Sequence, residues 1–142
     1  MKKSGILLAL VVLLAINLQN CQTCDDCQVT PPAKEVKVVN SSGDNLIFGA
    51  SAVYNPDNIV IKNNLGETIE FFTNTSNGTI DFGFTITADI YSIKLNASNT
   101  ETIKFTYGKD KNIDCCNEFD VTKTTTVNGK LVSNDDNITI VK

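Results

Sequence analysis

The sequence predicts a single all-β domain, an antiparallel β-sandwich, and three observations lead to this prediction. From Glu35 onward, apolar residues recur at every second position, which is the period of a strand with one buried face. The apolar runs are short and are bounded by Asn, Gly, Pro or Asp. No window after residue 30 has the 3.6-residue period of a helix, so no helical crossovers are expected. Immunoglobulin-like and transthyretin-like arrangements both fit this pattern.

Two stretches show the alternation most clearly, residues 79–87 and 101–107. In the first stretch, the side chains expected on the buried face are Ile80, Phe82, Phe84 and Ile86. In the second, we expect Ile103, Phe105 and Tyr107 to point inward and Glu101, Lys104 and Thr106 to point outward. Further strands are expected at residues 35–39, 45–49, 58–62, 67–73, 90–95 and 138–141.

Two turns are predicted from their residues. Residues 124–132 hold Asn128-Gly129 between two β-prone runs, and this dipeptide suits the type I′ turn of a hairpin because both residues tolerate positive φ. A second turn is expected at residues 54–58, where Pro56 and Asp57 stand between asparagines.

The N-terminus has the pattern of an export signal. Lys2 and Lys3 precede an uncharged apolar run, Gly5 to Ile16, which has the length of a signal-peptide core and is too short to span a bilayer. The following Leu18-Gln19-Asn20-Cys21 resembles the lipobox of bacterial lipoproteins, in which the cysteine is acylated and becomes the first residue. The resemblance implies that Cys21 is lipidated and that the protein is anchored to a membrane. The alternative is an ordinary secretory signal, with Cys21 as a disulfide partner.

We therefore divide the chain of 142 residues into three parts. Residues 1–20 are the expected lipoprotein signal peptide, residues 21–34 the lipid anchor and a flexible tether, and residues 35–142 the sandwich domain. The tether is expected to be flexible because it is polar, carries two prolines and lacks apolar periodicity. Asp25 and Asp26 resemble the acidic surface-export signal of lipoproteins from Bacteroidota.

Four cysteines remain if Cys21 carries lipid. An even number of cysteines in an exported chain indicates disulfide bonds. Three interpretations of these thiols stay open. We favour structural bridges; a redox role for the CxxC pair and a four-cysteine zinc site are the alternatives. The candidate disulfide residues are Cys24, Cys27, Cys115 and Cys116.

Composition excludes several function classes. The chain has no histidine, which removes the Ser-His-Asp and Cys-His nucleophile systems, and we predict no catalytic residues, no metal site and no cofactor. It has no arginine, and without the signal peptide ten lysines face sixteen carboxylates, so nucleic acid is not an expected partner. Two loops carry oxygen ligands that could each hold calcium, Asp110 with Asp114 and Asp135-Asp136-Asn137. Neither has the 12-residue spacing of a calcium loop, so we favour solvated turn residues over a calcium site.

The lipobox-like LQNC, the NLIFG segment with YNPDNIVI after it, the adjacent Cys115-Cys116 and the Asn128-Gly129-Lys130 hairpin together resemble the small β-rich cell-envelope lipoproteins of Bacteroidota. The resemblance implies export and a lipid anchor in the envelope, at the outer membrane and facing either the periplasm or the cell surface. We expect a non-enzymatic domain that binds an envelope protein or supports an assembly. A small hydrolase that uses carboxylates alone and a secreted adhesin or pilus-like subunit are the alternatives.

Overall fold

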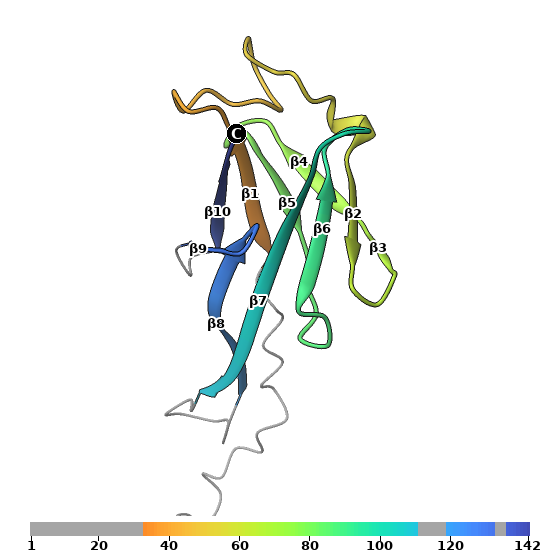
Figure 1. Ribbon diagram of the computed structural model, residues 1–142, viewed down its shortest axis with the longest axis vertical. Helices are drawn as coiled ribbons and strands as arrows, with labels where there is room; N and C mark the ends of the chain where they lie inside the picture. The colour runs from red at the N-terminus through yellow and green to blue at the C-terminus, as the bar shows by residue number, and fades with distance from the viewer. Residues whose placement is uncertain (1–32, 111–118, 133–135) are drawn as a thin grey trace, which may run out of the picture. The chain divides into compact units, whose positions relative to one another are not determined.

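The computed structural model describes residues 33–110, 119–132 and 136–142, and these residues form two β-sheets without an α-helix among them (Figure 1). The sheets pack face to face in a β-sandwich-like arrangement, which confirms the predicted all-β class.

The four-stranded sheet has the strand order β10-β1-β5-β4. Its strands are β1 (Lys34–Val39), β4 (Phe71–Asn74), β5 (Thr79–Phe82) and β10 (Asn137–Val141). β1 pairs with β5 in the antiparallel sense but with β10 in the parallel sense, from Glu35 opposite Asn137 to Val39 opposite Val141. The first and last described strands are therefore neighbours, and their pair departs from the antiparallel pattern that we expected.

The six-stranded sheet has the order β3-β2-β6-β7-β8-β9. Its strands are β2 (Val60–Asn63), β3 (Thr68–Ile69), β6 (Ile90–Lys94), β7 (Thr100–Asp110), β8 (Phe119–Val127) and β9 (Lys130–Val132). β2 pairs with both β3 and β6, β6 also pairs with β7, and β8 pairs with β9. All four of these pairs are antiparallel. The 3-10 turn η2 (Pro56–Asn58) precedes β2.

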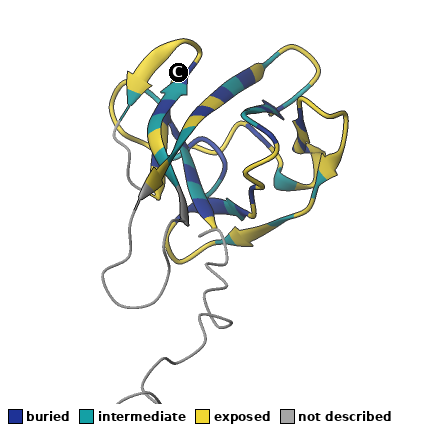
Figure 2. Ribbon diagram, turned by 90° about the horizontal axis from the view of Figure 1, so that it is seen from below, coloured by how far each residue is buried: buried dark blue, intermediate teal, exposed yellow. Residues whose placement is uncertain are grey.

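Both sheets contribute to one hydrophobic core. Val36 and Ile80 of the four-stranded sheet and Ile61, Tyr91 and Ile103 of the six-stranded sheet are fully buried. Buried and exposed residues alternate along the strands, as the period of two predicts (Figure 2). Aromatic rings join the layers, since the ring centroids of Phe82 on β5 and Tyr91 on β6 lie 5.6 Å apart.

The two predicted turns are confirmed. Asn128 and Gly129 connect β8 to β9 with φ angles of 51° and 80°, the positive values that a type I′ turn requires. Before β2, the Asn55 side chain accepts a hydrogen bond from the Asp57 amide at 3.0 Å, and Pro56 begins η2.

Two strand predictions were wrong. Residues 45–49 form no strand beyond a single bridge between Val39 and Asn45. The Asn45 side chain instead accepts hydrogen bonds from the amides of Ile47 and Phe48, which removes these donors from any ladder. The stretch 67–73 is not one strand but two, because the chain passes at Glu70 from β3 in one sheet to β4 in the other.

The inward face of two strands also needs correction. The stretch 79–87 leaves the sheet after Phe82, so Ile86 is 48% exposed rather than buried. Glu101, which we expected to point outward, is only 2% exposed. It shares its side of β7 with Ile103 and Phe105, as its odd position in the alternation requires.

Candidate functional site

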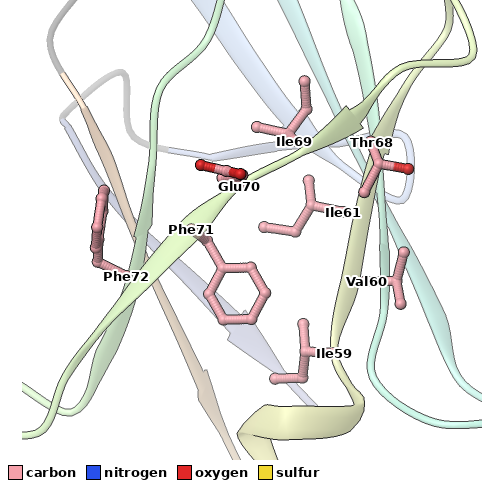
Figure 3. A pocket seen from close by; sticks show the side chains of 8 residues that line it. All are labelled: Ile59, Val60, Ile61, Thr68, Ile69, Glu70, Phe71 and Phe72. Atoms are coloured by element: carbon pink, nitrogen blue, oxygen red, sulfur yellow. The ribbon is translucent and has the colours of Figure 1, made fainter.

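An apolar groove lies between β2 and the β3 to β4 segment, where the edges of the two sheets meet (Figure 3). Its volume is about 330 Å³. The residues that line it are Ile59, Val60, Ile61, Thr68, Ile69, Glu70, Phe71 and Phe72.

The groove follows from the passage of the chain between the sheets. Because Glu70 joins β3 of one sheet to β4 of the other, β4 is not hydrogen-bonded to β2 and a gap remains between these edges. In Figure 3, the side chains of Ile59, Ile61 and Phe71 point into this gap, and Phe72 points away from it. Ile61 is fully buried, so the floor of the groove is the hydrophobic core itself.

β4 forms a free sheet edge beside the groove. It pairs with β5 on one side and stands last in its sheet, so no other strand within the described ranges pairs with it. Its sequence, Phe71-Phe72-Thr73-Asn74, has no charge and no proline, the features that usually protect an edge from pairing. The side chain of Phe72 is 76% exposed. This edge therefore offers both backbone hydrogen-bonding groups and apolar surface.

Glu70 is the one ionisable residue among the eight that line the groove. A pair of facing carboxylates, as glycoside hydrolysis needs, is not found among these lining residues. The groove is suited to binding an apolar surface.

An ion pair between a buried lysine and an exposed carboxylate lies at the start of β1. Lys34 is 2% exposed, and its Nζ donates a hydrogen bond of 2.7 Å to Oδ1 of Asp136, which is itself 57% exposed. The same Nζ lies 5.3 Å and 5.9 Å from the ring centroids of Phe84 and Phe105. The ammonium thus replaces its hydration by one carboxylate and two aromatic faces. The sequence-based division places Lys34 in the tether, whereas the structure places it at the start of β1. In the sequence, only its even-numbered position, shared with Val36 and Val38, indicates an inward side chain.

A buried carboxylate, Glu101, holds side chains from two other elements. Lys142, which follows β10, donates a hydrogen bond to Oε1, and Asn128 of the β8 to β9 turn donates one of 2.5 Å to Oε2. Burial acts to raise the pKa of the Glu101 carboxyl, but the hydrogen bonds from Lys142 and Asn128 outweigh burial and lower it. The hydrogen bond to Glu101 raises the pKa of the Lys142 ammonium. This cluster is not predicted from the sequence, because we expected Glu101 on the outer face.

The predicted site residues fall almost entirely outside the described ranges. Cys21, Cys24, Cys27, Cys115 and Cys116 all lie there, so lipidation and disulfide pairing stay predictions. Of the loop carboxylates considered for calcium, Asp114 and Asp135 lie there too. Asp136 binds Lys34 instead. Within residues 33–110, 119–132 and 136–142, no group of three or more His, Cys, Asp or Glu side chains is placed to hold a metal ion.

In the part of the chain that the structure describes, no helix is long and apolar enough to span a bilayer. No protein-family model, curated protein sequence or solved structure matches this chain.

Proposed function

We propose that this chain is a lipid-anchored envelope protein whose β-sandwich binds another envelope protein without catalysis. The anchor is supported by the sequence alone: two lysines, an apolar run of signal-peptide length and Cys21 three positions after Leu18. Two or three acyl chains on Cys21 give stable membrane attachment, because each buried methylene contributes about 0.8 kcal/mol.

The apolar groove beside the free edge of β4 is the observation that supports binding. A free edge is completed by an extended chain, because backbone N–H and C=O groups on both sides then pair. The groove adds a pocket for an apolar side chain of such a chain, next to Ile61 and Phe71.

The occupant that this surface fits best is an extended segment of an envelope protein with apolar side chains at alternate positions. Such a segment would place one set of side chains in the groove while its backbone pairs with β4. An uncharged segment is favoured because Phe71–Asn74 carries no charge to attract an opposite one. Phe72 would then be covered on the outer face of the extended sheet.

We also propose that the sandwich is of the immunoglobulin-like kind. The division of the strands into sheets of four and six, with sheet-to-sheet crossing at Glu70, resembles the larger immunoglobulin sandwiches, in which one sheet has more strands than the other.

The anchor is tested by metabolic labelling with a palmitate analogue. The unaltered chain should incorporate label and the Cys21→Ser variant should not. Equal labelling of the two chains would exclude a lipid on Cys21.

The binding surface is tested by chemical crosslinking in native envelopes, followed by purification of this chain and identification of what is joined to it. The unaltered chain should give a discrete adduct that the Phe72→Lys variant loses. Leu131→Lys is the matched control, since Leu131 is 67% exposed on β9 at the end of the other sheet. An adduct of two copies of this chain would favour the pilus-like alternative, and an adduct that Phe72→Lys retains would contradict binding at β4.

A further inference from the structure

Three side chains from separate elements converge on one end of the sandwich. Glu101 lies near the start of β7 on the face that points into the core, with its side chain 3% exposed. One carboxyl oxygen binds the Lys142 ammonium and the other accepts the Asn128 amide hydrogen bond. A buried carboxyl group therefore bridges an amine and a carboxamide.

The carboxamide is held by a second partner. Oδ1 of Asn128 accepts a hydrogen bond of 2.9 Å from the backbone N–H of Thr102. A peptide N–H at this oxygen polarises the carbonyl and stabilises negative charge that develops on the oxygen during attack at the carbon. Nδ2 of Asn128 thus donates to the Glu101 carboxylate, while Oδ1 accepts from the Thr102 N–H.

These are the parts that an amide exchange requires: an amine nucleophile, a carboxyl group that moves protons, and a carbonyl with a donor on its oxygen. We propose that Lys142 and Asn128 form an intramolecular amide bond between their side chains, with Glu101 as the general acid and base.

The reaction balances without any further reactant. The Lys142 ammonium passes a proton to the Glu101 carboxylate, and the free electron pair of Nζ attacks Cγ of Asn128. The lowered pKa of Glu101 and the raised pKa of Lys142 oppose this transfer, so only a small fraction of the chains carries the neutral amine at any moment and the bond forms slowly. A C–N bond forms while the carbonyl electrons move to Oδ1, beside the Thr102 N–H. Glu101 then protonates Nδ2, the Cγ–Nδ2 bond breaks, and the departing ammonia takes up the second proton of Nζ as ammonium. The chain loses one ammonia, about 17 Da, and nothing is oxidised or reduced.

The fold holds the reacting groups in place beforehand. The backbone N–H of Lys142 donates to the Val39 carbonyl at 2.9 Å, and the N–H of Asn128 donates to the Thr102 carbonyl at 2.8 Å. Held reactants of this kind gain rate because little motion remains to be frozen before attack. Since β10 belongs to one sheet and the β8 to β9 turn to the other, the product is a covalent bond between the two sheets.

Tryptic digestion of the full chain gives a direct test, because the two partners fall on separate peptides. Cleavage at lysine yields residues 124–130, with Asn128, and residues 131–142, with Lys142. The bond joins these peptides into one branched species whose mass is their sum less about 17 Da for the ammonia. A cyclic imide at Asn128-Gly129 also loses ammonia, but it lightens peptide 124–130 alone.

We expect the branched peptide from the unaltered chain and none from Lys142→Arg, because a guanidinium is not a nucleophile at neutral pH. Lys130→Arg is the matched control and should retain the branched peptide. Glu101→Gln should abolish or strongly slow the bond. Recovery of unjoined peptides from the unaltered, folded chain would overturn the proposal, as would ammonia loss confined to peptide 124–130 in both the unaltered chain and Lys142→Arg.

Discussion

Asparagine side chains shape many of the turns at the scale of single residues. Those of Asn40, Asn45, Asn55, Asn63 and Asn96 accept hydrogen bonds from backbone amides two to four positions further along the chain. Such bonds satisfy amides that no strand pairing reaches, and those of Asn40, Asn63 and Asn96 lie at or just after the ends of β1, β2 and β6. The sequence predicted a type I′ turn at Asn128-Gly129 and a turn of unspecified type at residues 54–58, where Pro56 marks the turn.

Removal of the Asn63 side chain should destabilise the fold. Asn63 is 6% exposed; it accepts from the amides of Leu65 and Glu67 and donates to the Glu67 carboxylate at 2.6 Å. We expect Asn63→Ala to lower the free energy of unfolding by about 2 kcal/mol, because two amides lose their acceptor. Asn58→Ala, at an exposed position, should stay within about 0.5 kcal/mol. Urea denaturation measures both, and equal effects would refute a special role for Asn63.

The ion pair between the buried Lys34 and the exposed Asp136 should respond differently to the loss of each partner. Asp136→Asn leaves the ammonium with weaker compensation and should cost about 1 kcal/mol, since Asp136 is half-exposed and water screens the pair. Lys34→Met removes the buried charge and packs a thioether against Phe84 and Phe105, so it should be close to neutral. A larger loss for Lys34→Met than for Asp136→Asn in urea denaturation would contradict this account.

Tyr107 should make the fold sensitive to alkali. Burial, then the neighbouring Tyr91 and Asp89, raise the pKa of the Tyr107 hydroxyl, which donates to the Ala88 carbonyl at 2.8 Å. An unfolded tyrosine ionises near pH 10, so above this pH the unfolded state releases a proton that folded Tyr107 retains, and stability falls. Denaturation across pH 8 to 11 should show a steeper fall for the unaltered chain than for Tyr107→Phe. Parallel curves would show that Tyr107 does not titrate with folding.

At the scale of elements, alternation predicted strands well and sheet membership poorly. The strands expected at 35–39, 90–95 and 101–107 are confirmed as β1, β6 and β7, because one face of each is buried. Nothing in the alternation marks the split of residues 67–73 at Glu70. Ile69 and Phe71 both stand at odd-numbered positions and are both half-buried, although they lie in different sheets. The groove depends on this crossing, so it was not predictable from the local pattern.

The β8 to β9 hairpin depends on glycine at one position. Gly129 has a φ of 80°, which is strained for any residue with a Cβ. Gly129→Ala should therefore lower the free energy of unfolding by about 1 kcal/mol. Gly83→Ala is the control, because a Cβ there meets no atom within 4 Å and φ is not in the left-handed region, and it should change stability by less than about 0.5 kcal/mol. Equal losses in thermal or urea unfolding would exclude strain at Gly129 as the cause.

At the scale of the whole molecule, anchoring and binding are assigned to different parts of the chain. The lipobox resemblance rests on residues 18–21, whereas the free edge is β4, at the opposite end of its sheet from β10. Composition and period predicted the all-β class, since these average over many residues. The pairing of β1 with β10 and the position of the free edge depend on long-range contacts, which a local period does not contain.

The central claim, that a partner strand pairs with β4, is tested most directly by hydrogen–deuterium exchange of the lipidated chain in native envelope vesicles and after purification. The account predicts that amides of Phe71–Asn74 exchange more slowly in the envelope than in the purified chain, and that Phe72→Lys removes this difference. The edge strand β9 should exchange alike in both preparations. Equal exchange of Phe71–Asn74 in both, or protection of β9 in place of β4, would contradict the account.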